Sequence, residues 1–359
     1  MKILQLRSSD VFSSPERLII GQCRHLPEFE FVCGSFVAPG RVNRFLDECR
    51  AAKIETAELA DSFPGDLRLI GHLRRLMIER RIDLVITHDY KASFYAFFAR
   101  RKLAVKQIAY FHGVTSEDKK VRIYNAIDRQ VLKRLPQVIA VSERTRQLLT
   151  DMGVPVDRIE VVPNAIDDAS LISQNQFEVR REGPARIIAA GRFSFEKGFD
   201  LLLQALGKAG DNAPPFQVDL YGLGPEEDKL RRMVDDFALQ GTVTFKGFVD
   251  SLLPALREAD FLVMPSRSEG MPVTVLEAWS QRLGLIATAV GGVPEIVSNG
   301  NNGLLIPPEN VDALAEKIVW ATENIDRMQQ YGAAGFDLVR EKYTYSRQAE
   351  QLRQIYSRT

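Results

Sequence analysis

The amino-acid sequence predicts an α/β protein of two doubly wound domains, each a parallel sheet with helices on both faces. Short apolar runs alternate with amphipathic stretches along the 359 residues, and a polar segment without clear periodicity, 168–185, interrupts the alternation once. Alternation of strands and helices implies right-handed crossovers and therefore parallel strands. The length suits two domains of ordinary size. The polar segment contains Gly183-Pro184 and is the expected linker.

The first series of apolar runs predicts an N-terminal domain over residues 1–168. Strands of a parallel sheet covered on both faces are expected to be short and apolar. The predicted strands are 2–6, 29–36, 54–59, 84–87, 107–111, 138–141 and 160–162. Amphipathic spacing predicts helices between them, including 67–79 and 120–135.

The second series predicts a C-terminal domain over residues 169–342, and we expect the terminal segment 343–359 to pack back on the N-terminal domain. The predicted strands are 187–190, 217–221, 242–245, 261–264, 285–288 and 303–306. Helices are expected to begin near 197, 225, 250, 272, 294 and 311, and two more close the chain at about 325–341 and 345–357. In such sheets ligands bind beyond the carboxyl ends of the strands, at helix N-termini.

Composition sets broad limits. Lys and Arg total 47, as do Asp and Glu, so the charge gives no sign of a nucleic-acid partner. The three cysteines, Cys23, Cys33 and Cys49, lack the spacing of a metal site, and so sparse a count suits a reducing compartment. No signal peptide is recognisable, and no run approaches the roughly 18 apolar residues of a membrane span. We therefore expect a cytoplasmic protein.

Two cations lie in the turn that follows the predicted strand 187–190. The segment reads G-R-F-S-F-E-K-G, with Arg192 and Lys197 between Gly191 and Gly198. A diphosphate requires fixed positive charge and backbone N–H donors, and this segment offers both. A solvated loop with ordinary surface cations has the same composition. The segment alone therefore leaves both interpretations open.

Two carboxylates lie around the helix start that follows the predicted strand 261–264. Glu269 precedes the helix, and Glu277 lies about one and a half turns inside it. Carboxylates so placed could accept hydrogen bonds from two diols of one ligand, such as those of a sugar and of a ribose. In an isolated pair of this kind, one Glu more often interacts with the helix dipole while the other is exposed to solvent.

Taken together, the two segments resemble the retaining GT-B glycosyltransferases of family 4. Glu269 and Glu277 match the family's E-x7-E motif, and Arg192 and Lys197 match its G-R-x4-K-G element. Further matching segments occur in the family's order: V-P-N-A-I-D at 162–167, G-L-G-P at 222–225, G-G-V-P-E at 291–295 and N-G-L-L at 302–305. The resemblance covers residues 160–310 well and the first half loosely. It implies the GT-B fold, in which two Rossmann-like domains face each other across a cleft.

The resemblance also implies an activity and a site. The chain would be a retaining hexosyltransferase that uses a nucleotide-diphosphate sugar as co-substrate and needs no metal or other cofactor, in keeping with the absence of any Asp-x-Asp element. Arg192 and Lys197 would neutralise the donor diphosphate, and Glu277 would accept from the ribose. The other implied donor-binding residues are Val273 and Thr274 for the phosphates, Glu269, Gly270, Met271 and Pro272 for the sugar, and Val249 for the base. The implied catalytic set is His112, Glu269, Arg192 and Lys197.

The first half is expected to bind the acceptor. His112 follows the predicted strand 107–111 and aligns with a family histidine close to the reacting sugar carbon, and His88-Asp89 is a second candidate. The family often has Gly-Gly after its first strand, whereas the loop 7–16 here has no glycine, so its role stays open. E-G-M-P also replaces the commoner E-G-F-G, a change that bears on sugar choice.

The expected acceptor is a polysaccharide, a lipopolysaccharide or a lipid-linked glycan intermediate. The basic stretch 100–146 would suit anionic lipid headgroups and peripheral contact with the inner membrane face, although a solvated face of two helices has the same composition. Its basic residues include Arg100, Arg101, Lys102, Lys119, Lys120, Arg122, Lys133 and Arg134. Two other functions stay open: a GT-B-like sugar-nucleotide epimerase, and an inactive paralogue that only binds nucleotide sugars.

Overall fold

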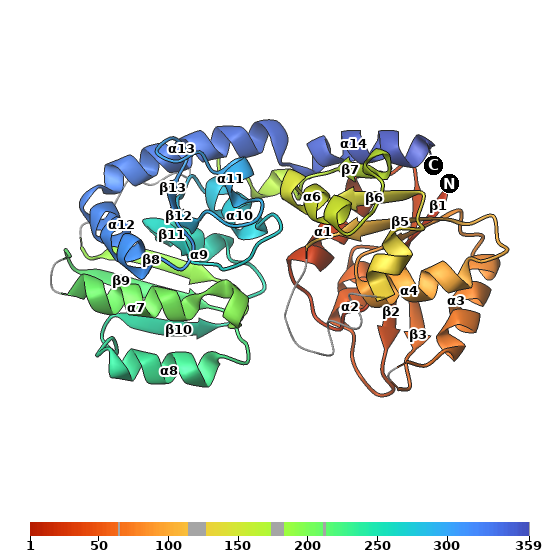
Figure 1. Cartoon of the computed structure of the whole chain (residues 1–359), viewed down its shortest axis with the longest axis horizontal. Coiled ribbons are helices and arrows are strands. Elements are labelled where there is room, and N and C mark those ends of the chain that lie inside the picture. Colours follow the sequence, from red (N-terminus) through yellow and green to blue (C-terminus); the bar gives the residue numbers. More distant parts are fainter. Residues whose placement is uncertain (64, 114–126, 174–182, 211–212, 359) are drawn as a thin grey trace. The chain divides into compact units, whose positions relative to one another are not determined.

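The chain forms two compact units, each built on one parallel sheet (Figure 1). The computed structural model describes residues 1–63, 65–113, 127–173, 183–210 and 213–358. Unit 1 comprises Met1–Asn164 and Tyr345–Thr359, and unit 2 comprises Ala165–Thr344. The predicted α/β class, with two Rossmann-like parallel-sheet domains, is confirmed.

Unit 1 holds a seven-stranded sheet of order β3-β2-β1-β4-β5-β6-β7, and every neighbouring pair is parallel. Its strands are β1 Lys2–Arg7, β2 Glu30–Val37, β3 Glu55–Ala60, β4 Leu84–Thr87, β5 Lys106–Phe111, β6 Gln137–Ala140 and β7 Ile159–Val161. Each coincides with a predicted strand to within two residues at either end. The central strands are buried on both faces, which is why continuous apolar runs identified them.

The helices of unit 1 cover both faces of its sheet. They are α1 Ser14–His25, α2 Arg44–Ala51, α3 Arg68–Glu79, α4 Tyr90–Ala99, α6 Glu143–Asp151 and α14 Tyr345–Arg358. Leu4 and Val32 point to a core with α3 and α4, whereas Cys33 points to a core with α1 and α2. Of the predicted helix 120–135, residues 127–132 are helical, and 120–126 lie outside the described residues.

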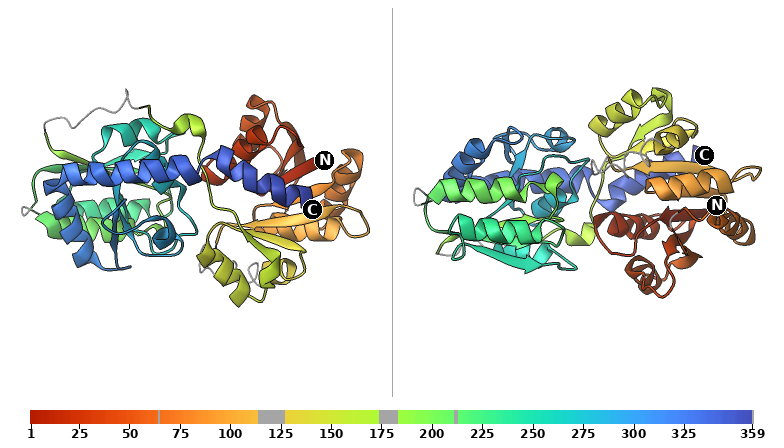
Figure 2. Two further views of the ribbon diagram at one scale, coloured as in Figure 1. Left: turned by 90° about the horizontal axis from the view of Figure 1, so that it is seen from above. Right: turned by 60° about the horizontal axis from the view of Figure 1, so that its bottom comes forward.

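Unit 2 holds a six-stranded sheet of order β10-β9-β8-β11-β12-β13, again parallel throughout. Its strands are β8 Ala185–Ala190, β9 Phe216–Tyr221, β10 Val243–Gly247, β11 Phe261–Met264, β12 Gly284–Thr288 and β13 Leu304–Ile306. Its helices are α7 Phe199–Ala209, α8 Glu227–Asp236, α9 Leu253–Glu258, α10 Val273–Ser280, α11 Val293–Ile296, α12 Val311–Glu323 and α13 Ile325–Lys342. Helices α7 and α12 lie side by side in Figures 1 and 2 and share one core with the sheet.

Each sheet reverses its strand order at one point. In unit 1 the chain runs outward from β1 through β2 to β3 and then returns to β4 on the other side of β1. In unit 2 the chain runs from β8 through β9 to β10 and then returns to β11 on the other side of β8. Loops that leave neighbouring strands on opposite sides open a crevice at such a switch point, where doubly wound proteins bind ligands. Ligand-binding residues of both units are therefore expected beyond β1/β4 and β8/β11.

Candidate active site

Three loops of unit 2 meet beyond the carboxyl ends of β8, β11 and β12. The loop after β8 is bound to the loop after β11 by a hydrogen bond of 2.8 Å from Arg267 N to Glu196 O. The loop after β12 is bound to that second loop by a hydrogen bond of 3.0 Å from Gly292 N to Gly270 O. Backbone pairing thus brings the segments 191–198, 265–272 and 289–292 together at one edge of the sheet.

Two glycines make this approach feasible. Gly198 has a φ of +66°, and a Cβ there would lie 2.1 Å from the carbonyl oxygen of Pro265. Gly291 has a φ of +55°, and a Cβ there would lie 1.6 Å from the carbonyl oxygen of Glu269. Only glycine combines a left-handed backbone with so close a neighbour. The close approach of the loops therefore explains why glycine occupies position 198 of the G-R-x4-K-G segment and position 291 of the G-G-V-P-E segment.

Lys197 and Glu269 are brought into direct contact by this arrangement. Lys197 Nζ lies 2.8 Å from Glu269 Oε1, and Ser266 Oγ donates to the same oxygen at 2.7 Å. The Glu269 side chain is only 8% exposed and that of Lys197 29%, so water screens the pair less than a surface ion pair. A cation and a carboxylate predicted from separate motifs thus occupy one point beyond the β8/β11 switch.

Arg192 lies on the segment 191–198 and Glu277 on the helix α10 that follows the segment 265–272, and among the described residues neither is paired with Lys197 or Glu269. Arg192 is exposed, two residues beyond the end of β8, and no residue in the described part of the chain forms a hydrogen bond or ion pair with its guanidinium. Glu277 is the fifth residue of α10 and is partly buried. The helix that carries Glu277 starts from the loop that carries Glu269.

The remaining predicted donor-binding residues lie at the same edge of the sheet. Pro272 is the N-cap of α10, so Val273 and Thr274 belong to its first turn, where backbone N–H groups have no acceptor inside the helix. Gly270 is partly buried, and Met271 and Pro272 are buried beside it. Val249 follows β10, whose last residue, Gly247, accepts a 2.8 Å hydrogen bond at its carbonyl oxygen from Gly222 N in the loop after β9. No described contact joins Val249 to Glu269.

Arg267 joins the loops of the candidate site, a role that the sequence did not reveal. Its guanidinium donates to both carboxylate oxygens of Asp200, at 2.7 and 2.9 Å, and to Phe195 O at 2.9 Å. It also donates to Glu309 at 3.0 Å and lies 4.1 Å from the centre of the Phe195 ring. Burial alone would raise the pKa of Asp200, but hydrogen bonds and charge from Arg267 bring the net pKa below its ordinary value. Arg267 therefore holds the turn Phe195–Lys197 against the loop that carries Glu269.

In unit 1, two histidines adjoin each other beyond β4 and β5. His88 Nδ1 lies 3.4 Å from His112 Nε2, and His88 Nε2 lies 2.7 Å from Gln5 Oε1. Both rings stack against Tyr110, with centroid distances of 5.5 and 5.0 Å. Since Gln5 Oε1 accepts, His88 Nε2 carries the proton and His88 Nδ1 accepts from His112 Nε2. His112 Nδ1 is then left unprotonated and can accept a hydrogen bond.

Burial keeps these imidazoles neutral. Burial and, secondarily, the Arg7 charge lower the pKa of His112 to about 3, while Glu16 opposes the shift. Burial, His112 and Arg7 lower the pKa of His88 as well. His112 is therefore an uncharged hydrogen-bonding group at neutral pH rather than a cation.

The glycine-poor loop 7–16 is held by side chains. Arg7 forms an ion pair with the fully buried Glu16, whose carboxylate also caps α1 through Ser13 N at 2.9 Å. Ser8 N donates to Asp89 Oδ2 at 2.6 Å, and Asp89 Oδ1 caps α4 through Ala92 N at 2.9 Å. Asp89 thus links the loops beyond β1 and β4, the two strands of the switch point.

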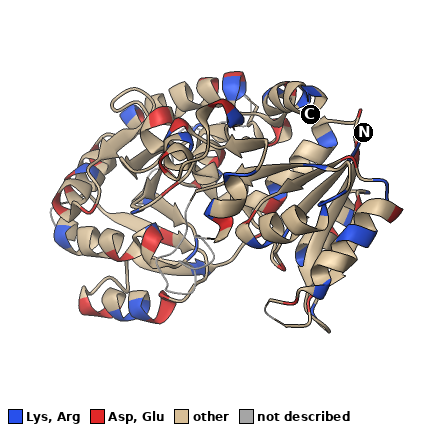
Figure 3. Cartoon of the chain, turned by 45° about the vertical axis from the view of Figure 1, so that its right-hand side comes forward, with Lys and Arg blue, Asp and Glu red and all other residues tan. Residues whose placement is uncertain are grey.

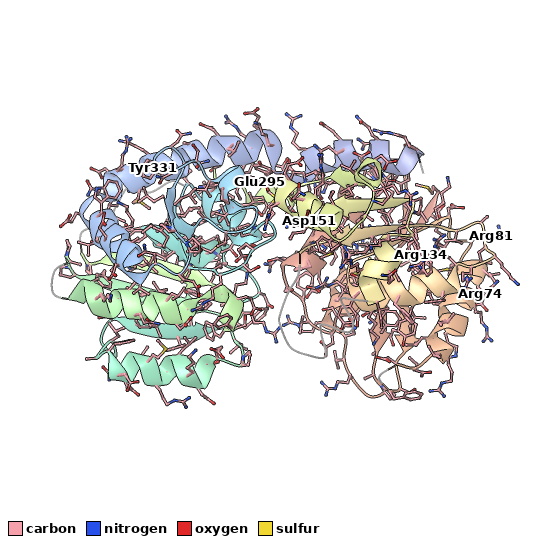
Figure 4. The ribbon with its side chains drawn as sticks, viewed as in Figure 1. Arg74, Arg81, Arg134, Asp151, Glu295 and Tyr331 are labelled. Carbon is pink, nitrogen blue, oxygen red and sulfur yellow. The ribbon has the colours of Figure 1, made fainter. Side chains whose placement is uncertain are left out.

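The basic stretch 100–146 is only partly described, because Lys119, Lys120 and Arg122 lie outside the described residues. Arg100 donates to Gln107 and lies 5.4 Å from the Phe97 ring centre, and Arg134, labelled in Figure 4, donates to Gln130 O at 2.6 Å. Figure 3 shows basic and acidic residues intermixed on the helices. In the described ranges, no helix is both long and apolar enough to cross a bilayer.

Two parallel-sheet Rossmann-like domains, each with its polar loops gathered at the switch point, define a protein of the GT-B class. Comparison with known families agrees. The family model "Glycosyltransferase Family 4" matches residues 16–170, and the model "Glycosyl transferases group 1" matches residues 172–337. The chain belongs to the group 1 glycosyltransferases of the GT-B fold.

Individual relatives are distant. WcaL of Escherichia coli, provisionally named as a colanic acid biosynthesis glycosyltransferase, is 27% identical over 254 residues, which cover 66% of this chain and 61% of WcaL. The phosphatidyl-myo-inositol mannosyltransferase of Mycolicibacterium smegmatis is 25% identical over 289 residues, which cover 79% and 73% of the two chains. For WcaL of Salmonella typhimurium the matched region spans 53% of the relative's length.

Solved structures agree on the fold over the whole chain. Anabaena Alr3699/HepE in complex with UDP-glucose has a TM-score of 0.89 at 20% sequence identity, with 100% of both chains covered. The lipopolysaccharide outer core galactosyltransferase WaaB in its apo form has a TM-score of 0.74 at 18% identity, again with 100% of both chains covered. At these identities the likeness establishes the fold.

Proposed function

We propose that this protein is a retaining glycosyltransferase that moves a hexosyl unit from a nucleotide-diphosphate sugar to a glycan acceptor. The observation that carries the proposal is the partly buried Lys197–Glu269 pair at the β8/β11 switch point. The ammonium group of Lys197 can bind a phosphate, and the carboxylate of Glu269 can accept a hydrogen bond from a sugar hydroxyl. The family membership of the chain and the UDP-glucose complex of the structurally similar HepE support this interpretation.

The donor-binding roles follow from charge and position. Arg192 and Lys197 would neutralise the diphosphate, and the first-turn amides of Val273 and Thr274 would donate to its oxygens. Glu277 would accept from the ribose hydroxyls. Glu269, with Gly270, Met271 and Pro272, would hold the transferred hexose, and Val249 would lie against the base.

Catalysis in this proposal depends on stabilising the leaving group. As the bond between the anomeric carbon and the phosphate oxygen breaks, negative charge grows on the diphosphate, and the two cationic side chains stabilise it without a metal ion. The acceptor oxygen bonds to the anomeric carbon on the same face, and its proton passes to the departing phosphate oxygen. Neutral His112 would act from unit 1 as a hydrogen-bonding group close to the reacting carbon.

The acceptor belongs to unit 1 in this proposal. A polysaccharide, lipopolysaccharide or lipid-linked glycan intermediate is the proposed acceptor class, since one relative is named for colanic acid biosynthesis and another as a phosphatidyl-myo-inositol mannosyltransferase. We place the reaction in the cytoplasm. Peripheral contact of the basic stretch with the inner membrane face is part of the proposal.

A thermal-shift screen of UDP-, GDP- and ADP-sugars tests the proposal, because a ligand that binds only the folded state raises its apparent stability. We expect one nucleotide to raise the unfolding temperature of the wild-type protein. That sugar nucleotide should then release nucleoside diphosphate only when acceptor is present. An epimerase would convert the sugar without acceptor, and an inactive paralogue would bind the nucleotide without turnover; either result contradicts transfer.

A further inference from the structure

The Lys197–Glu269 ion pair places a negative charge where a diphosphate is proposed to bind. Lys197 Nζ lies 2.8 Å from Glu269 Oε1, and both side chains are largely shielded from water. An anion that approaches Lys197 therefore shares the ammonium group with Glu269 and is repelled by the carboxylate. In a partly desolvated site this repulsion is stronger than it would be in water.

The two oxygens of Glu269 have different surroundings. Oε1 accepts from Lys197 and from Ser266, at 2.8 and 2.7 Å. Oε2 accepts no hydrogen bond from any residue in the described ranges. It is also not one of the buried polar atoms that lack a hydrogen-bond partner, so it keeps access to solvent. A hydroxyl group can therefore donate to Oε2 while the ion pair stays in place.

A nucleotide sugar and a free nucleoside diphosphate meet this carboxylate differently. The sugar conjugate brings hydroxyl groups that can donate to Oε2, and its terminal phosphate is esterified. The free diphosphate brings no such donor, and its terminal phosphate, with a second pKa of about 6, gains further negative charge at neutral pH. The first ligand gains a charge-assisted hydrogen bond from Glu269, whereas the second meets only repulsion.

We infer that Glu269, through its ion pair with Lys197, determines the preference of this site for a sugar-bearing nucleotide over the free nucleoside diphosphate. The inference rests on the proposed function. It gives Glu269 a role beyond contact with the sugar, since its charge weakens binding of the product that remains after transfer. Specificity then comes from repulsion of the wrong ligand as well as from attraction of the right one.

The test is isothermal titration of wild-type and Glu269→Gln protein with UDP, GDP and ADP and with their glucose conjugates. Glutamine keeps the shape and an acceptor oxygen but removes the charge. Glu269→Gln should bind the free diphosphate about fivefold more tightly, the effect of roughly 1 kcal/mol from one nearby charge. It should bind the glucose conjugate no more tightly than wild type. Unchanged or weaker binding of the free diphosphate would overturn the inference.

Two further variants separate charge from structure. Glu196→Gln removes a carboxylate from the same turn as Lys197, and no described residue forms a hydrogen bond or ion pair with the Glu196 side chain, so its affinities should change less than twofold. In Lys197→Ala, adding Glu269→Gln should bring a smaller gain for the free diphosphate than it brings in wild type, because the competition for the cation is lost and only the direct repulsion remains. A gain of the same size without Lys197 would contradict the ion-pair explanation.

The outcomes also separate this inference from the proposed function. If wild-type protein binds none of the six nucleotides, the donor-site assignment fails, and the inference fails with it. If wild type binds a glucose conjugate but Glu269→Gln leaves the ratio of the two affinities unchanged, only the inference fails.

Discussion

Lys197 is the residue on which the diphosphate assignment depends most. Lys197→Ala should weaken binding of the nucleotide sugar by about ten- to a hundredfold, because a hydrogen bond to a charged group contributes about 1.5–3 kcal/mol. Lys208→Ala is the matched control. Lys208 lies on α7 of the same unit and pairs with Asp312, and its side chain is 54% exposed. Calorimetric titration of both variants measures the effect. Equal affinities for the two variants would remove Lys197 from the site.

The lowered pKa of His112 makes the stability of the protein depend on pH. Its pKa is about 3 in the folded protein and about 6.5 in an unfolded chain, so between these values the unfolded state binds more protons. Stability then rises with pH through this range and falls on acidification below about 6.5. Urea unfolding midpoints at pH 5 and 7.5 should differ less in His112→Asn than in wild type. The same difference in both proteins would contradict the burial of a neutral imidazole.

The sequence indicated which residues could bind a ligand, but it did not indicate which residues contact one another. Lys197 and Glu269 could be predicted because cations, carboxylates and glycines recur around strand ends in the family's motifs. Their contact could not, because the two residues are 72 positions apart and meet only since β8 and β11 are neighbours. Arg267 was missed for the same reason, because its partners lie far away in the sequence: Asp200 in the first turn of α7 and Glu309 in the loop before α12.

At the scale of elements, the loops beyond the strands carry the proposed donor site, and Arg267 holds two of these loops together. Arg267→Lys should lower nucleotide affinity about fivefold, because lysine cannot bind Asp200 bidentately and reach Phe195 O as well. Arg231→Lys is a matched control on α8, where Arg231 pairs with Glu227 and lies 4.3 Å from the Phe245 ring centre. Titration should show no loss for that variant. A similar loss in both would mean that Arg267 has no special positioning role.

Gly291 tests the close approach of the loops after β11 and β12. Gly291→Ala should destabilise the protein and weaken nucleotide binding, because the new Cβ meets Glu269 O at 1.6 Å and must displace it. Gly300→Ala is the control for backbone strain alone, since Gly300 has a φ of +74° but no neighbouring atom within 4 Å. That control should cost about 1–2 kcal/mol and leave binding intact. Thermal unfolding and titration would contradict the account if the two variants behaved alike.

The strands were predictable as elements, and their order in the sheets was not. Buried parallel strands such as β4 and β11 are continuous apolar runs, and a single sequence shows them directly. Strand order depends on pairing between distant segments, for which apolar runs hold no information. The switch points at β1/β4 and β8/β11, which bring the site residues together, therefore emerged only with the structure.

At the scale of the whole molecule, each unit has its own core, and α14 returns to unit 1 after the chain has passed through unit 2. Gln348 of α14 donates to Pro163 O at 2.5 Å and to Tyr110 Oη at 3.3 Å, and accepts from Gln22 at 3.1 Å. Gln348→Ala should destabilise unit 1 by about 2–3 kcal/mol, because it leaves buried polar groups unpaired. Nucleotide affinity should stay unchanged, since the proposed donor residues lie in unit 2.

Hydrogen exchange can follow the two units separately in that variant. Faster exchange should be confined to unit 1, and the exposed Gln354 of the same helix provides the control, since Gln354→Ala should exchange like wild type. Equal acceleration in unit 2 would show that the two cores do not respond independently.

A crystal structure of the protein with the nucleotide sugar that gives the largest thermal shift tests the central claim most directly. The account predicts a diphosphate oxygen within hydrogen-bonding distance of Lys197 Nζ, beyond the β8/β11 switch point, and a sugar hydroxyl on Glu269 Oε2. A nucleotide bound away from both residues, with the Lys197–Glu269 pair undisturbed, would contradict it.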